Sequence, residues 1–155
     1  MMRSYFIALL VMSFWTISGQ TDGTIQQKEN QCEVVTRSGE GKLVNAAIDC
    51  KFLEYHKLDV ELLGVRGELS EKGKTQLDTE VLPLLQQGFR VEIASDYTSR
   101  RTSSENKTIS IRRAIRLAQH LSQQGIDDDY FLIRGNGDTA GTTGFSFRVI
   151  PFEEE

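Results

Sequence analysis

From Lys57 onward, hydrophobic and polar residues alternate in several short stretches, as they do in half-buried β-strands. The alternation predicts strands at residues 58–62, 89–95, 130–133 and 145–149. Between the strands, apolar residues recur at helical spacing over residues 77–85 and 111–121. The predicted order is strand, helix, strand, helix, strand, strand. This order predicts an α/β fold of the α+β sandwich type, with a small mixed sheet and both helices packed on one face.

Local signals set the expected ends of the two helices. Ser70 is placed to cap the first helix, Gly88 can end it, and Pro83 predicts a kink or short break inside it. For the second helix, we expect Ser110 as the N-cap and Gly125 at the C-terminal cap. Residues 95–108 have no apolar periodicity and are therefore expected to form a long polar loop ahead of the second helix.

The N-terminus has the pattern of a secretory signal peptide. Arg3 supplies a positive charge, an apolar run extends from Tyr5 to Trp15, and the small residues Ser18 and Gly19 follow. The run is about 11 residues long, shorter than the roughly 20 residues that a membrane-spanning helix needs. We expect residues 1–19 to be removed on export, which leaves no integral membrane span, while an uncleaved anchor is the alternative. About 135 residues then remain, enough for one domain.

Cys32 and Cys50 are the two cysteines of the chain. An even pair in an exported protein predicts a disulfide. Residues 33–37 and 42–48 have the pattern of two strands around a glycine-containing loop, so the bridge would tie the open end of a β-hairpin. The expected organisation is a signal peptide at 1–19, an N-terminal extension with the hairpin at 20–56, a main domain at 57–152 and an acidic tail at 153–155.

Charge and composition exclude several classes of function. The formal net charge of −4 disfavours nucleic acids and anionic membranes as partners. His56 lies at the expected domain boundary, and His120 is expected on the solvated surface of the second helix. No catalytic triad, metal-ligand spacing or phosphate-binding glycine motif can be assembled from the sequence. We therefore expect a protein that is not an enzyme and that needs neither a metal nor a cofactor.

Arg112 and Arg113 stand at the expected start of the second helix. If Ser110 is the N-cap, both cations face the positive end of the helix dipole, which costs roughly 0.3–1 kcal/mol for each. One explanation is a salt bridge to Glu105 or Asp96, or simple exposure to solvent. The other is an anion site, in which first-turn amides and a guanidinium bind a carboxylate or phosphate.

Four motifs occur in an order that matches a known family. They are Leu69-Ser70-x-x-Gly73, Asn106-x-x-Ile109-Ser110-x-x-Arg113-Ala114, Arg134-Gly135-Asn136-Gly137-Asp138 and Phe147-Arg148-Val149. On these motifs, residues 58–152 resemble the OmpA-like peptidoglycan-binding family, which includes OmpA C-terminal and MotB-like domains. The resemblance implies a βαβαββ domain in the periplasm, associated with the cell envelope or outer membrane.

The family holds the diaminopimelate side chain of a peptidoglycan stem peptide, which carries one ammonium and one carboxylate. The resemblance implies that Arg113 binds the carboxylate and that Asn106 orders the loop. Family members carry a Thr-Asp pair after the second strand, but counting back from Asn106 places Tyr97-Thr98 there. Asp96 is the nearby carboxylate and is therefore expected to accept the ammonium. The implied ligand-binding residues are Asp96, Thr98, Asn106 and Arg113.

Two functions remain open at this point. The first is a non-catalytic cell-wall-binding module that holds peptidoglycan without a covalent bond. The second is an OmpA-like scaffold or adaptor that has lost this ligand and contacts an envelope protein complex through the disulfide-tied hairpin. The position of Asp96 is the sequence feature that separates them. Asp96 lies two residues before the position at which the family carries its aspartate, and the first function needs Asp96 in the site.

Overall fold

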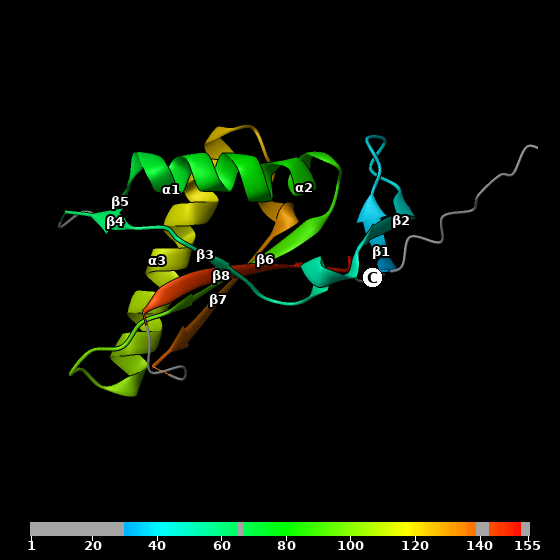
Figure 1. Ribbon diagram of the computed structural model, residues 1–155. Helices are drawn as coiled ribbons and strands as arrows, with labels where there is room; N and C mark the ends of the chain where they lie inside the picture. The colour runs from blue at the N-terminus through cyan, green and yellow to red at the C-terminus, as the bar shows by residue number, and fades with distance from the viewer. Residues whose placement is uncertain (1–29, 65–66, 139–142, 153–155) are drawn as a thin grey trace, which may run out of the picture.

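The computed structural model describes residues 30–64, 67–138 and 143–152, and its main unit is a four-stranded sheet of order β3-β8-β6-β7. The strands are β3 (His56–Leu58), β6 (Arg90–Asp96), β7 (Phe131–Gly137) and β8 (Gly144–Ile150). β7 runs parallel to β6, whereas β8 is antiparallel to both β3 and β6. The helices α1 (Glu71–Gln76), α2 (Leu82–Gln86) and α3 (Ser103–Gln123) cover one face of this sheet (Figure 1). The predicted mixed sheet with helices on one face is confirmed.

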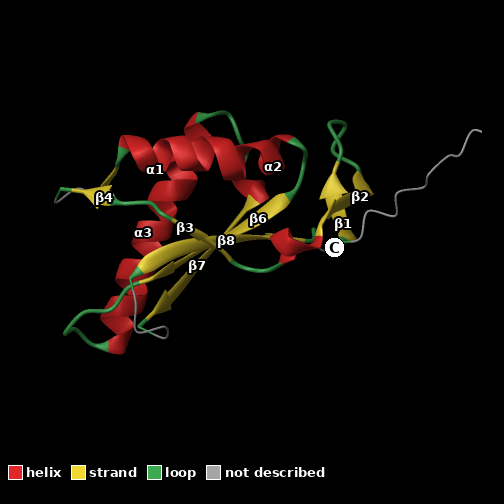
Figure 2. Ribbon diagram, in the orientation of Figure 1, coloured by secondary structure: helices red, strands yellow, loops and turns green. Residues whose placement is uncertain are grey.

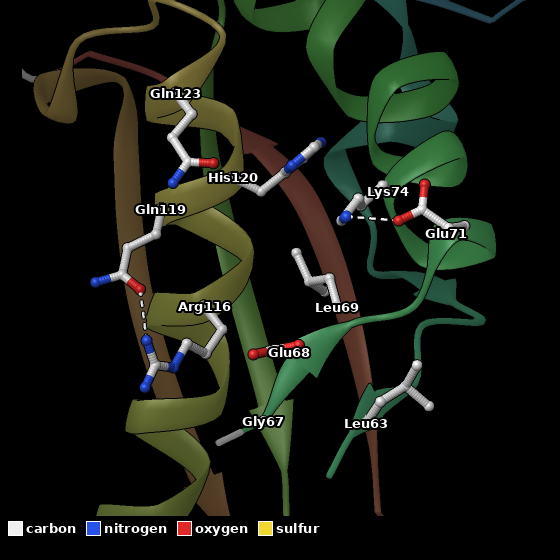
Figure 3. Close-up of a pocket in the computed structure, with 10 residues that line it drawn as sticks. All are labelled: Leu63, Gly67, Glu68, Leu69, Glu71, Lys74, Arg116, Gln119, His120 and Gln123. Carbon is white, nitrogen blue, oxygen red and sulfur yellow. Dashed lines mark hydrogen bonds and ion pairs between the residues drawn. The ribbon is translucent and has the colours of Figure 1, made fainter. Parts of the chain in front are cut away.

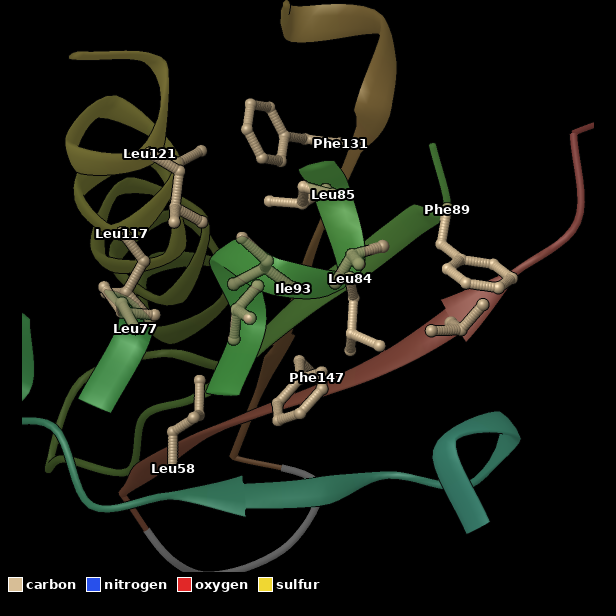
Figure 4. Packing of buried hydrophobic residues seen from close by; sticks show 14 of the residues in the cluster. Leu58, Leu77, Leu84, Leu85, Phe89, Ile93, Leu117, Leu121, Phe131 and Phe147 are labelled. Atoms are coloured by element: carbon tan, nitrogen blue, oxygen red, sulfur yellow. The ribbon is translucent and has the colours of Figure 1, made fainter. Parts of the chain in front are cut away.

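The core lies between the helices and the sheet face that they cover. Ile93 and Phe147 from the sheet meet Leu77, Leu117 and Leu121 from the helical layer, and each is at most 1% exposed (Figure 4). These residues occupy the periodic apolar positions of the sequence. Full burial of a large aliphatic or aromatic side chain stabilises a fold by about 1.5–3 kcal/mol, so the apolar pattern accounts for the arrangement of the layers.

The first helical segment contains the predicted break. Ser70 caps α1 by accepting a hydrogen bond from the Gly73 amide at 3.1 Å, as expected. A π-helical turn at Leu77–Val81 then separates α1 from α2, and Pro83 lies in the first turn of α2. Pro83 has no amide hydrogen, so the regular α-helical bonding pattern cannot continue through it. Gly88 follows α2 with φ +90°, the left-handed conformation that ends helices.

The predicted strand at 58–62 is wrong in its extent. β3 ends at Leu58, which pairs with Phe145, and its partner β8 begins only one residue earlier, at Gly144. Residues beyond Asp59 would therefore find no partner strand. The chain instead leaves the sheet and forms a second small hairpin. Its strands are β4 (Leu62–Leu63) and β5 (Glu68–Leu69).

The glycine-rich stretch at 134–138 is mainly strand, so the strand predicted at 130–133 extends further than expected. β7 continues to Gly137. A Cβ atom on Gly135 would lie 2.4 Å from the Ile111 side chain and 2.6 Å from the Ser110 hydroxyl. Only glycine permits this close approach of strand and helix, so the residue is required here by packing rather than by a turn.

The N-terminal hairpin is confirmed, with its disulfide. β1 (Gln31–Arg37) and β2 (Leu43–Asp49) are antiparallel, and Cys32 is bonded to Cys50 at the open end, just before the 3-10 helix Cys50–Leu53. The hairpin stands at one end of the molecule, beside α2 (Figure 2). The Arg37 amide donates to the Gly88 carbonyl and the Phe152 amide to the Val35 carbonyl, both at 3.1 Å. These bonds attach the β1 side of the hairpin to the main sheet unit.

Two of the predicted segments are not described by the structure. The expected signal peptide at 1–19 and the acidic tail at 153–155 lie outside the described residues. Within the described ranges, no helix has the length and apolar character needed to cross a bilayer.

Candidate functional site

α3 begins seven residues before the predicted N-cap, which corrects the sequence-based view of this region. Thr102 is the N-cap, and it forms a capping box with Glu105. The Thr102 hydroxyl accepts from the Glu105 amide at 3.3 Å, and the Glu105 carboxylate accepts from the Thr102 amide at 3.0 Å. The connection from β6 therefore comprises only residues 97–102. Arg112 and Arg113 lie well inside the helix, so the expected conflict with the helix dipole does not exist.

Ser110 and Asn106 are buried polar residues of α3 rather than loop residues. The Ser110 hydroxyl donates to the Lys107 carbonyl at 2.8 Å and accepts from the Gly137 amide at 3.1 Å. Asn106 accepts from the Ser99 hydroxyl at 2.7 Å, and its amide donates to the Ser99 carbonyl at 3.4 Å. Both side chains are fully buried. They attach the end of β7 and the loop after β6 to the first half of α3.

Arg113 projects from α3 onto two aromatic rings. Its guanidinium carbon lies 4.8 Å from the centre of the Phe145 ring and 5.4 Å from that of Tyr97. The Nε atom is buried and has no hydrogen-bond partner, and no acidic group of the described residues forms an ion pair with this side chain. The salt bridge to Glu105 or Asp96 considered from the sequence is therefore not formed.

Burial lowers the pKa of the Arg113 guanidinium, which nevertheless keeps its charge at neutral pH. A half-buried charge without a counterion is unfavourable unless another group compensates for it. The aromatic faces supply part of that compensation. An anion that reaches Arg113 would supply the rest.

No ion pair joins the predicted acid, Asp96, to Arg113 among the described residues. Asp96 ends β6, where the pairing with β7 shifts in register between Ser95 and Asp96. The pairing with β8 stays regular there, and alternation along β6 predicts that Asp96 lies on the same face as Glu92. Thr98 lies in the following loop, where its amide donates to the Thr143 hydroxyl at 3.3 Å. A second carboxylate, Asp138, follows β7 and accepts from the Ser103 hydroxyl at 2.8 Å, at the start of α3. The sequence places Asp138 directly after a glycine motif, but only the structure brings it to this helix.

The opposite face of the sheet contains a charge cluster that sequence reasoning missed. Glu92 has a side chain only 3% exposed and accepts from the Tyr55 hydroxyl. Arg148 Nη2 lies 2.9 Å from one carboxylate oxygen and Arg134 Nη1 lies 3.5 Å from the other. Burial alone would raise the pKa of Glu92, but the bonds from Tyr55 and Arg148 outweigh it and hold the pKa below its usual range. This cluster is therefore internally compensated.

A separate cavity lies among α1, α3 and the β4–β5 hairpin (Figure 3). It measures about 650 Å³. Lys74 is paired there with Glu71 at 2.6 Å, and Arg116 donates to Gln119 at 3.1 Å. His120 is bonded to Asp78 at 2.8 Å and is 9% exposed, so its predicted position on the solvated surface is wrong. These cations already have partners, and we therefore place the candidate site at Arg113.

The described residues contain neither a candidate metal site nor an isolated His56. Across the described part of the chain, no group of three or more potential ligands could hold a metal ion. His56 lies in β3 and packs between the rings of Phe52 and Phe147, at 5.2 and 5.5 Å between centres. It is part of an aromatic cluster at the base of the hairpin.

Comparisons with known proteins assign no family to the chain. No family model matches the sequence, and no curated protein matches it. Among solved structures, the chain is similar to the OmpA-like domain of FopA1 from Francisella tularensis subsp. tularensis SCHU S4. The TM-score is 0.46 and the sequence identity 16%, over 86% of this chain and 90% of the other.

Proposed function

We propose that this chain is a non-catalytic, cell-wall-binding module of the cell envelope, which binds a carboxylate of the peptidoglycan stem peptide at Arg113. One observation carries the proposal: Arg113 is half-buried, stacked on Tyr97 and Phe145, and without a carboxylate partner among the residues that the structure describes. A planar guanidinium with free N–H groups matches a carboxylate in two parallel hydrogen bonds.

The surroundings of Arg113 fit a rigid binding site. Asn106 and Ser110 fasten the neighbouring loop and strand to α3, so the guanidinium stands on an element whose position is fixed by buried hydrogen bonds. Sites on well-supported helices hold their geometry more closely than sites on loops. The sequence resemblance to the OmpA-like family places the carboxylate-binding role on this same residue.

The proposed ligand, diaminopimelate, also has an ammonium group that needs an acid. Asp96 and Thr98 are our predicted contacts, although alternation along β6 predicts that Asp96 lies on the face opposite α3. Asp138 is a second carboxylate at the same end of the sheet and is held by Ser103. The two acids are distinguished by Asp96→Asn and Asp138→Asn, because the variant that removes the ammonium partner lowers the affinity for diaminopimelate-containing fragments.

Co-sedimentation with purified peptidoglycan sacculi tests the central assignment. We expect Arg113→Ala to weaken binding by at least about tenfold, since it removes a charge-assisted bidentate contact. Arg112→Ala is the matched control, because Arg112 is the exposed neighbour on the same helix and should bind as the parent does. Circular dichroism and a denaturation curve verify that both variants are folded. Undiminished sacculus binding by Arg113→Ala would refute the site.

A second candidate function is an adaptor in an envelope protein complex that does not bind peptidoglycan. The alternation along β6 favours it, because a site with Arg113 but with neither Asp96 nor Asp138 in reach of the ligand would hold only half of a zwitterion. In that case the parent protein fails to sediment with sacculi. A partner that crosslinks specifically through the β1–β2 hairpin would then support the adaptor function.

A further inference from the structure

The β1–β2 hairpin has one edge joined to the molecule and one edge without a partner strand. The Ser38 amide donates to the Lys42 carbonyl, and the Cys50 amide donates to the Asn30 carbonyl, both at 2.8 Å. In an antiparallel ladder, hydrogen-bonded pairs alternate along each strand. Even-numbered residues of β2 therefore bond to β1, and the backbone groups of odd-numbered residues point outward.

The outward N–H and C=O groups of β2 belong to Leu43, Asn45 and Ala47. None of them bonds to another backbone group in the described ranges. Part of the corresponding edge of β1 is used, since the Arg37 amide and the Val35 carbonyl bond to Gly88 and Phe152. β2 is thus an open edge on the side of the hairpin that faces away from those contacts.

The open edge lacks the usual protection against strand pairing. Natural edge strands are blunted by charges, proline or bulges. From Leu43 to Ile48, β2 has no charged residue, no proline and no bulge in its pairing with β1. The charges at its two ends are internally neutralised, because Lys42 pairs with Glu40 at 3.1 Å and Lys51 with Asp49 at 3.0 Å. The edge therefore carries no net charge.

The two ends of β2 differ in a way that makes the strand complementary to itself. At the first end, Val44 is 42% exposed and Leu43 is 39% exposed. At the disulfide end, a cavity of about 620 Å³ lies between the hairpin and α2. Ile48, Leu84 and Phe147 are among its apolar lining residues, and its polar lining includes Gln31, Thr79 and Gln87 and the charged residues Asp49, Lys51 and Glu80. An exposed apolar side chain at one end thus matches the apolar part of a cavity of mixed lining at the other.

We propose that β2 pairs with β2 of a second copy of this chain, antiparallel and about a two-fold axis at Ala46. This register places Asn45 opposite Ala47 and Val44 opposite Ile48 of the second copy. Each Val44 then lies over the cavity beside Ile48 in the other molecule, so the contact is reciprocal, as two-fold symmetry requires. The two hairpins form one continuous sheet in the order β1-β2-β2-β1.

A second copy fits the edge better than a charged partner. The chain has a formal charge of −4, so two copies repel each other in general. They avoid this repulsion where they meet through a neutral strand whose end charges are already paired. A four-stranded sheet is also more stable than an isolated two-stranded hairpin.

Sedimentation equilibrium of the purified protein with its disulfide intact tests the proposal. We expect a monomer–dimer equilibrium, and we expect Asn45→Pro to raise the dimer dissociation constant at least about tenfold by removing a central outward donor. Glu33→Pro is the matched control, because it places proline on the opposite edge of the same hairpin. A monomeric parent protein at about 0.5 mM, or equal weakening by the two variants, overturns the proposal.

A crosslinking experiment tests the register. Ala46 lies on the two-fold axis in a non-hydrogen-bonded pair, where Cα atoms are about 4.5 Å apart and disulfides form readily. Under mild oxidation, we expect Ala46→Cys to form a covalent dimer much faster than Asn45→Cys, with peptide mapping to verify the Cys32–Cys50 bond. Equal rates for the two variants, or no covalent dimer from either, would contradict this register and the dimer built on it.

Discussion

The two faces of the main sheet each hold an arginine in partly buried surroundings, and the two differ in how the charge is compensated. On the face away from the helices, Arg148 is paired with Glu92 at 2.9 Å and stacks 4.7 Å from the Tyr55 ring. On the face covered by α3, Arg113 stacks on Phe145 and Tyr97 but has no carboxylate partner within the described ranges. Arg148 therefore has a carboxylate partner within the fold and Arg113 has none among the described residues, whereas the Nε atoms of both are buried without a hydrogen-bond partner.

This difference separates a structural charge from a ligand-binding one. Removing one partner of a buried ion pair leaves a charge that has lost its compensation, so the Glu92 cluster should matter for stability. Arg113 has no partner to lose, so its removal should matter for binding more than for stability. Strongly perturbed groups occur both in structural networks and in sites, and the presence of an internal partner distinguishes the two.

Glu92→Gln should have the largest effect on stability. We expect the free energy of unfolding to fall by about 3 kcal/mol, the lower end for a broken buried pair, because Arg148 and Arg134 remain partly exposed. Urea denaturation followed by circular dichroism measures the change. Glu61→Gln at an exposed position serves as the control and should stay within about 0.5 kcal/mol of the parent. If Glu92→Gln lowered the free energy of unfolding by no more than about 0.5 kcal/mol, the Glu92 cluster would not contribute to stability.

The same substitution at the two arginines compares the faces directly. We expect Arg148→Met to lower the free energy of unfolding by about 2 kcal/mol, because it leaves the Glu92 carboxylate buried with a weaker partner. Arg113→Met should change it by less than about 1 kcal/mol in either direction, since the lost stacking on aromatic rings is offset by removal of an unpaired charge. Urea denaturation of both variants supplies the comparison. Equal losses would identify Arg113 as a structural residue.

The sequence predicted the layers of the fold because they depend on local periodicity. Alternation located β6 and β8, helical spacing located the apolar face of α3, and the even cysteine pair Cys32 and Cys50 located the tied hairpin. Ser70 and Gly88 marked ends of the first helical segment correctly, since capping depends on residues close together in the chain.

The start of α3 was mispredicted although its signal was present. Thr102 and Glu105 have the spacing of a capping box, but the apolar periodicity begins only later, at Ile111, and Ser110 is also a good N-cap residue. The first turns of α3 expose most of their residues to solvent, so they lack the apolar stripe by which a helix is recognised.

The Glu92 cluster and the role of Gly135 depend on contacts between distant segments. Glu92 meets Arg148 because β6 and β8 pair in one register, and Gly135 is required because β7 runs close beneath α3. Neither the register nor the helix–strand distance follows from a single sequence. The position of Asp96 relative to Arg113 depends on the same non-local geometry, so the candidate site was only partly predictable.

Acid titration gives the smallest of the expected effects and separates the two faces by their pH dependence. The pKa of Glu92 is lower in the folded protein than in the unfolded chain, where a glutamate titrates near pH 4.3. Its contribution to stability is therefore present above that pH and is lost as the pH falls through the lower, folded value. We expect the stability difference between the parent and Glu92→Gln to be constant from about pH 7 to 5 and to shrink as the pH falls below about 4. Urea denaturation across this range measures it, and Arg113→Met should follow the parent throughout, because no carboxylate of the described residues is paired with Arg113. If the stability of Arg113→Met changed with acid pH differently from that of the parent, the difference would reveal a carboxylate partner of Arg113. Arg113 would then be a structural residue.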